Sequence, residues 1–322
     1  MSNVLILFSQ VILDKQNPTG LICFYECFAN ELRENGNNVL CINLYSIDNI
    51  DAGCIHSIKT FKPDIIFTFN NRITDEIIKN TNCPICVMNA DGIDMWTNVH
   101  LITQNMDRYY LFSFWQGWEQ SKYKKLGLGK NRIIPLHMAT SLRAKRTRKT
   151  INISFIGSVF PQAEHEIMNM YLKDSDFQQD ALDVLYNGNV TLDKFFKKYK
   201  NRFNNSVLQC YPLLDPRLPV LNSIVDMGLN LYGTGWDKLP NEYLLLKSAF
   251  KNQPVYSFVD NEKIYNSSRI NISISHPQCK GYAFPWRVFD IMASNGLLIS
   301  SYSSLLENLT SSSVKIPMFK SP

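Results

Sequence analysis

The feature that most constrains this chain is a regular alternation of short apolar runs with segments of helical periodicity. The run NVLILFS (3–9) is typical of a buried parallel strand. After a loop at NPTG, the stretch LICFYECFANELRENG (21–36) repeats apolar residues at helical spacing and ends at Gly36, a common helix stop. Further strand candidates follow over short connections: NVLCINL, PDIIFTFN, CPICVMNAD, YYLFSF and RIIPLHMA. This order predicts a doubly wound α/β domain.

A second α/β pattern begins at INISFIGS (151–158), and 322 residues are enough for two domains. A charge-rich helical stretch follows, and then LNLYGTGW, a helix at EYLLLKSAF, the strand RINISIS, a helix within GYAFPWRVFDIMASNG and the strand GLLISSY. Between the two patterns, LRAKRTRKT (142–150) is polar and basic and has no apolar stripe. We therefore predict domains at 1–141 and 151–322, joined by a solvated linker. A patch for nucleic acid or a membrane surface is the functional alternative for this basic run.

Composition narrows the class of protein. Hydrophobic residues make up 45% and charged residues 19%, as in a packed globular protein, and the net charge of +5 weakly favours anionic partners. No stretch approaches the roughly 18 to 20 apolar residues of a membrane span, and the N-terminus lacks the basic region of a signal peptide. We expect a cytoplasmic protein.

The cysteines and the acidic residues do not form a recognisable metal site. Eight cysteines are scattered along the chain, and the pair in CPIC (83–86) is not followed by further ligands at metal spacing. The acidic triplet DSD (174–176) lies in the charged helical stretch rather than at a strand end. We predict reduced, buried thiols and no metal.

The late helix carries two charges among apolar residues. Pro285 is well placed in a first helical turn, which puts Arg287 beside the helix N-terminus. An arginine and free backbone N–H groups together suit an anion such as a diphosphate. Asp290 lies on the same face and could accept hydrogen bonds from two ribose hydroxyls. The alternative is an ordinary ion pair between Arg287 and Asp290, worth about 0.2–0.5 kcal/mol.

Glycines mark the ends of two strands in the second half. Gly157 and Ser158 close FIGS, and Gly233 follows LNLY, so that backbone can approach a phosphate closely at both places. His276 lies in the loop between RINISIS and the late helix, at a strand end of the kind where α/β sheets bind ligands. Neither glycine loop is a GxGxxG fingerprint, and FSQVILDKQNPTG after the first strand is not one either. This argues against a nicotinamide-dependent oxidoreductase.

The motifs FIGS, LYGTGW, EKIYNSSRINISIS and GYAFPWRVFDIMASNGLLISS (together spanning about 151–301) resemble GT-B glycosyltransferases, in particular the CgeB-like branch of group 1. The resemblance implies two Rossmann-like domains facing a cleft, with the donor in the second. It implies that Arg287 lies near the donor diphosphate and that Asp290, in place of the family's usual Glu, binds the ribose. It also places a further set of residues at the donor site: Gly157, Ser158, Gly233, Tyr265, His276 and Tyr282.

Two departures from the family limit the prediction. Tyr282 stands where retaining relatives carry the first Glu of an E-x7-E pair, so the stereochemical outcome is not predicted. Relatives usually continue with helices that cross back to the first domain, whereas this sequence stops at IPMFKSP. We expect a chain that is short or truncated at its C-terminus.

The predicted function is metal-independent transfer of a sugar from a nucleotide-diphosphate donor to a hydroxyl acceptor, in bacterial surface-glycan synthesis. No cofactor is expected besides the donor substrate. The acceptor would be a glycan or a lipid-linked glycan, compatible with peripheral contact at the inner face of the membrane and with no nucleic acid. Candidates for a general base are Asp91 and His137, with Asp94 as a further option, although Asp91 could cap a turn and His137 could be structural. A catalytically silent binding module of the same fold is the alternative.

Overall fold

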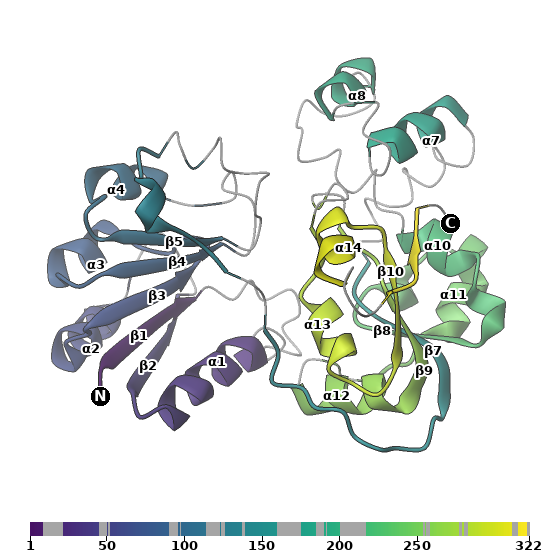
Figure 1. Cartoon of the computed structure of the whole chain (residues 1–322), viewed down its shortest axis with the longest axis horizontal. Coiled ribbons are helices and arrows are strands. Elements are labelled where there is room, and N and C mark those ends of the chain that lie inside the picture. Colours follow the sequence, from purple (N-terminus) through teal and green to yellow (C-terminus); the bar gives the residue numbers. More distant parts are fainter. Residues whose placement is uncertain are drawn as a thin grey trace. The chain divides into compact units, whose positions relative to one another are not determined.

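The computed structural model divides the chain into two compact units, Met1–Met138 and Ala139–Pro322 (Figure 1). The residues that the structure describes are 1–8, 22–44, 50, 52–89, 96, 98–113, 123, 126–136, 139–159, 175–184, 190, 192–199, 217–253, 255, 258–276, 279, 283–310 and 315–320. Each unit is built on a parallel sheet with helices, so the prediction of two doubly wound, Rossmann-like domains is confirmed.

The first unit contains a six-stranded parallel sheet in the order β2-β1-β3-β4-β5-β6. Its strands are β1 (Asn3–Phe8), β2 (Asn38–Asn43), β3 (Ile65–Phe69), β4 (Ile85–Asn89), β5 (Tyr109–Ser113) and β6 (Ile133–Pro135). Its helices are α1 (Ile22–Glu34), α2 (Ala52–Phe61), α3 (Asp75–Asn80) and α4 (Val99–Gln104), with a 3-10 turn at Lys130–Arg132. As predicted, α1 stops at Gly36, whose φ is 81°.

Strand β1 explains why the first unit needs helices on both faces of its sheet. Leu5 and Leu7 join the larger core, whereas Val4 and Ile6 join a smaller core with Ala29 of α1. Successive side chains of a strand point to opposite faces, so an unbroken apolar run requires cover on both sides. The unbroken apolar run NVLILF therefore predicts a sheet with helices on both faces.

The second unit contains a five-stranded parallel sheet in the order β11-β10-β9-β7-β8. Its strands are β7 (Ile151–Ile156), β8 (Leu229–Tyr232), β9 (Ser268–Ser273), β10 (Leu297–Ser301) and β11 (Met318–Phe319). Its helices are α7 (Ser175–Leu182), α8 (Leu192–Tyr199), α10 (Arg217–Asn222), α11 (Leu244–Ala249), α12 (Phe258–Ser267), α13 (Arg287–Met292) and α14 (Ser304–Thr310), with 3-10 turns at Val225–Met227, Trp236–Lys238 and Asn241–Tyr243. The strand order reverses between β7 and β9, and such a switch point opens a crevice at the carboxyl ends of the strands.

The basic run between the two patterns is solvated over residues 143–148, but it is hydrogen-bonded to the second unit and so differs from the predicted linker. Residues 139–150, which we call the strap, belong to the second unit and run extended along it. Leu142 is only 1% exposed, and its neighbours are fastened to α12 and to the turn before β10. The division at Met138 and Ala139 therefore precedes the boundary that we predicted from composition.

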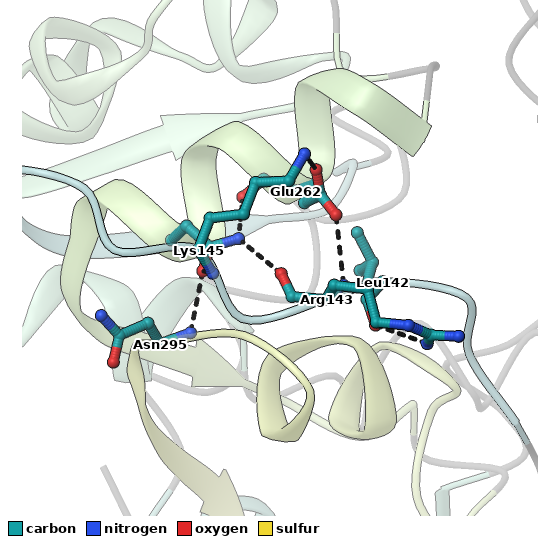
Figure 2. A network of polar contacts seen from close by, with 6 residues as sticks. Leu142, Arg143, Lys145, Glu262 and Asn295 are labelled. Carbon is teal, nitrogen blue, oxygen red and sulfur yellow. Dashed lines mark hydrogen bonds and ion pairs between the residues drawn. The ribbon is translucent and has the colours of Figure 1, made fainter.

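The buried side-chain amide of Asn266 forms hydrogen bonds with two residues of the strap and with two neighbouring segments of the second unit. The Asn266 side chain accepts from the N–H groups of Lys145 (2.8 Å) and Asn295 (3.0 Å). It donates to the carbonyl oxygens of Arg143 (3.1 Å) and Glu262 (2.9 Å). Figure 2 shows the strap residues Leu142, Arg143 and Lys145 beside Glu262 and Asn295, with an ion pair between Lys145 and Glu262. Because the partners are mostly backbone groups, a polar sequence without an apolar stripe can be fastened to the unit while residues 143–148 stay exposed.

Six cysteines of the described residues are free thiols, as predicted: Cys27, Cys41, Cys54, Cys83, Cys86 and Cys279. Only Cys83, Cys86 and Cys279 are buried, whereas the prediction expected buried thiols throughout. Burial raises the pKa of Cys86 to about 12, and it also raises the pKa of Cys83. Both thiols of the CPIC pair are therefore protonated at neutral pH and poorly nucleophilic.

Neither a membrane-spanning helix nor a metal-binding cluster is present among the described residues. None of the helices in the described ranges combines the length and the hydrophobicity that crossing a bilayer requires. Within the same ranges, no three His, Cys, Asp or Glu side chains are grouped closely enough to hold a metal ion.

Candidate functional site

The loop after β7 has three consecutive carbonyl groups that are each held by a side chain. Arg287 Nη1 donates to the carbonyl oxygen of Ile156 at 2.6 Å, and Trp236 Nε1 donates to that of Gly157 at 2.8 Å. Arg217 Nη1 donates to the carbonyl oxygen of Ser158. The loop follows the strand at the switch point of the sheet. With its carbonyl oxygens engaged by donors, this loop repels an anion less than an ordinary strand end does.

Ser158 has donors that remain for a ligand. Its neighbours in the loop use their N–H groups, since Gly157 donates to Tyr232 O (2.9 Å) and Val159 to Thr234 O (3.0 Å). The N–H of Ser158 has no acceptor among the described residues. Its hydroxyl oxygen accepts from the Thr234 hydroxyl at 2.9 Å and from the Thr234 N–H at 3.3 Å, which leaves the hydroxyl hydrogen to donate elsewhere. Both donors suit a phosphate oxygen.

The two predicted glycines pack against each other. Gly233 has a φ of 121°, and a Cβ there would lie 2.3 Å from the carbonyl oxygen of Gly157. A Cβ on Gly157 would lie 2.9 Å from Arg287 Nη1 and 2.7 Å from the Phe155 ring. Gly157 therefore lets the guanidinium cross the loop, and Gly233 lets the loops after β7 and β8 approach each other. The contribution of Gly233 to the candidate site is therefore to allow this close contact between the two loops.

Arg287 reaches the loop from the start of α13. Its guanidinium carbon lies 5.5 Å from the centre of the Phe155 ring, in a cation–π contact. A guanidinium carries five N–H donors in a planar fork that suits a phosphate, and one of its nitrogens, Nη1, donates to the Ile156 carbonyl oxygen. The sequence pattern placed the helix start at Pro285, whereas α13 begins at Arg287 after a turn in which Val288 N–H bonds to Pro285 O at 3.0 Å.

Asp290 is half-buried and is held by the strap. Thr140 Oγ1 donates to Asp290 Oδ1 at 2.5 Å, and the described residues offer no partner to Oδ2. The alternative of an ion pair between Arg287 and Asp290 is not realised among the described residues. Burial raises the pKa of Asp290 above its ordinary value, while the Thr140 hydrogen bond and the Arg287 charge act in the opposite direction.

Tyr265 and His276 complete the described part of the predicted set. Tyr265, on α12, is buried, and burial raises the pKa of its phenol; Arg287 lowers this pKa and Asp290 raises it further. The phenol is therefore close enough to both charges to sense them. His276 follows β9 and is half-buried, and its carbonyl oxygen accepts from Cys279 N–H at 2.8 Å.

The remaining predicted residues cannot be placed. Asp91, Asp94, His137 and Tyr282 lie outside the described residues. The predicted donor-site residues that can be placed come from one unit and lie at the carboxyl ends of β7, β8 and β9, on α12 and on α13.

Sequence reasoning missed Arg217, Thr140 and Trp236. Trp236 is fully buried against Phe155, and its indole N–H also donates to the loop. Arg217 is buried at the start of α10. An arginine in the apolar stretch RLPVLN could have signalled a buried role, because a buried charge needs partners. Thr140 gave no such signal.

One family model matches part of the second unit. Residues 217–322 match the family model described as "Glycosyl transferase-like". No curated protein sequence matches the chain. The matched region starts at the first residue of α10 and includes β8 to β11 of the second unit.

Three solved structures are similar to the chain at low TM-scores. One is T4 phage BGT in complex with its UDP-glucose substrate, with a TM-score of 0.39, 11% identity and coverage of 92% of this chain and 80% of that one. The second is the DNA-modifying enzyme beta-glucosyltransferase (0.37, 12% identity, 92% and 79%). A third structure is TarM (0.37, 10% identity), of whose chain 47% is covered against 82% of this one.

Proposed function

We propose that the chain is a glycosyltransferase that moves a sugar from a nucleotide-diphosphate donor to a hydroxyl acceptor. The observation that carries the proposal is the loop 156–158, whose three carbonyl oxygens are held by Arg287, Trp236 and Arg217 while the Ser158 donors remain. The match of residues 217–322 to glycosyl transferase-like proteins supports the same reaction class. The CgeB-like branch remains a finer proposal, based on the quoted motifs.

The chemistry requires stabilisation of the diphosphate as it departs. Negative charge grows on the phosphate oxygens, and the Ser158 N–H and the Arg287 guanidinium are donors of the kind that stabilises it. Preorganised donors of this type commonly contribute about 10²–10³ in rate each. Protein charges could do this work without a metal ion or any cofactor besides the donor. Asp290 Oδ2 would accept from the donor ribose.

The acceptor side of the reaction rests on the sequence alone. We propose a glycan or lipid-linked acceptor of bacterial surface polysaccharide, with transfer at the cytoplasmic side of the membrane and no nucleic acid partner. Asp91 and His137 remain the candidate general bases for an inverting reaction. A binding module without catalysis is the alternative, because Tyr282 replaces an acidic residue of retaining relatives.

The test is nucleotide binding followed by turnover. UDP, GDP, CDP and dTDP are each added to the purified chain, and at least one should raise its melting temperature. Arg287→Ala should abolish that rise and lower donor hydrolysis or transfer at least 10²-fold while the protein stays folded. The matched control is Arg269→Ala, an exposed arginine near the amino end of β9, which should keep both activities.

Two results would contradict the proposal in different ways. If none of the four nucleotides shifts the melting temperature, the donor site does not exist. If a nucleotide binds through Arg287 but no donor sugar is hydrolysed or transferred, the silent binding module is the correct alternative.

A further inference from the structure

The contact between Thr140 and Asp290 joins residues 150 positions apart and lies at the predicted ribose acid. We infer that Thr140 is a positioning residue that holds one oxygen of the Asp290 carboxylate and so presents the other to the ribose hydroxyls of the donor. The inference rests on the proposed function, since it takes Asp290 to be the residue that binds the ribose. It assigns a specificity role to the first residues of the strap.

Two hydrogen bonds orient the Thr140 hydroxyl toward Asp290. Its oxygen accepts from the N–H of Leu142 at 3.1 Å, and its hydrogen is donated to Asp290 Oδ1 at 2.5 Å. Leu142 is buried, so the group that orients the hydroxyl is itself fixed. Asp290 Oδ1 is therefore engaged, and Oδ2 is the oxygen with lone pairs for a ligand.

The strap is fastened to the unit that carries Asp290. Its N–H groups at Arg143 and Lys145 donate to Glu262 Oε1 (3.1 Å) and to Asn266 Oδ1 (2.8 Å). The Thr147 hydroxyl donates to Asn266 O at 2.8 Å. Thr140 is thus held in place independently of Asp290, as a group that orients another side chain must be.

A positioned carboxylate matters more here because the acid is an aspartate. Asp is one methylene shorter than Glu, so it reaches a ribose over a smaller range of positions. The charged and titratable groups that act on Asp290 are Arg287 and Tyr265, and the Thr140 hydrogen bond works with Arg287 to favour the ionised form. Loss of the Thr140 hydroxyl should therefore change both the direction and the ionisation of the carboxylate.

The experiment compares ribose with deoxyribose nucleotides. The dissociation constants of UDP, GDP and CDP and of their 2′-deoxy forms are measured for the wild type and for Thr140→Val, which removes the hydroxyl at constant size. The wild type should prefer the ribose form of the nucleotide that it binds. In Thr140→Val this preference should fall about tenfold, the loss expected for one hydrogen bond to a charged group, while binding of the deoxy form stays the same.

Two further variants separate positioning from simple loosening of the strap. Thr140→Ser keeps a hydroxyl and should keep the ribose preference. Thr147→Val removes a strap hydrogen bond that does not involve Asp290, and it should leave the preference unchanged. A ligand-free measurement supports these: the pKa of Asp290, followed by carboxyl-carbon NMR, should rise in Thr140→Val but not in Thr147→Val.

The outcomes distinguish this inference from the proposed function. A wild type that binds nucleotides with a ribose preference that Thr140→Val retains overturns the inference alone, as does an Asp290 pKa that Thr140→Val leaves unchanged. A wild type that binds none of the nucleotides overturns the proposed function, and the inference falls with it.

Discussion

The carboxyl edges of the two sheets have the same topology but different chemistry. In the second unit the described residues at this edge include Arg287, Asp290 and the donors of Ser158. In the first unit the last residues of β4 and β5 are neutral: Asn89 Nδ2 donates to the Tyr123 hydroxyl, which also lies 3.0 Å from Ser113 Oγ. The comparison teaches that strand order creates the crevice, whereas the few residues after each strand decide which ligand charge it tolerates.

The two edges also place backbone strain differently. Asn70 and Asn71, which directly follow β3, have φ values of 55° and 50°. In the second unit the left-handed positions after β8 are the glycines Gly233 and Gly235. Asparagine tolerates this region better than most residues but keeps an amide side chain there. At the first edge the left-handed positions therefore carry amide side chains. At the second edge they carry no side chain, so that neighbouring loops can approach each other closely.

The largest expected effect tests whether close approach is essential to the second edge. Gly233→Ala places a Cβ 2.3 Å from the carbonyl oxygen of Gly157, in a left-handed conformation. We expect about 3 kcal/mol or more of lost stability, measured by denaturant unfolding, together with loss of nucleotide binding. The control is Gly36→Ala in the first unit, where φ is 81° but no atom lies within 4 Å, so only about 1 kcal/mol should be lost. Equal losses at both positions would show that the contact between the two loops is not important.

A smaller effect is expected from the edge of the first sheet. Tyr123→Phe removes the hydroxyl that joins Asn89 to Ser113 and should cost about 1–3 kcal/mol, since these buried groups lose a partner. The nucleotide affinity should not change, because the donor site is assigned to the second unit. A loss of nucleotide affinity at constant stability would break the division of roles between the two edges.

The smallest effect concerns the charge of the second edge. Because the pKa of Asp290 is raised in the folded protein, its ionised form lowers stability at neutral pH. Asp290→Asn should therefore raise the melting temperature by a few degrees at pH 7. The gain should shrink as the pH falls through the raised pKa and vanish below the ordinary aspartate value, where the wild-type carboxyl is also neutral. Melting curves from pH 3 to 7 measure this, and a gain that does not depend on pH would exclude the electrostatic explanation.

Much of the fold was readable because its signals are local. Apolar runs located β1 to β5 and β7 to β10, and Gly36 located the end of α1. The glycine that closes FIGS also marked the loop that contains Ser158. The two-residue strand β11 was not predicted, because a segment of that length has no period to recognise.

The rest of the candidate site depends on contacts that are distant in sequence. Thr140 and Asp290 are 150 positions apart, and Arg217 and Ser158 are 59 apart. No local pattern marks either pair. The strap looked like a linker because its anchors are main-chain groups and one asparagine, and neither produces an apolar stripe. Likewise, the apolar sequence of α13 does not show which of its residues are buried: Val288 and Ile291 are completely buried, whereas Met292 is exposed.

The strap has a consequence for dissecting the molecule. A fragment that starts at β7, where the second sheet begins, would omit the strap. Arg143 and Lys145 of the strap fill two of the four hydrogen-bonding positions of the Asn266 side chain, and Glu262 and Asn295 fill the other two. The fragment would leave a buried amide half satisfied and expose the apolar surface beneath Leu142. The autonomous part of the second half is therefore longer than its α/β pattern, and its natural first residue is Ala139. A residue range chosen from secondary structure alone would cut through the unit it was meant to isolate.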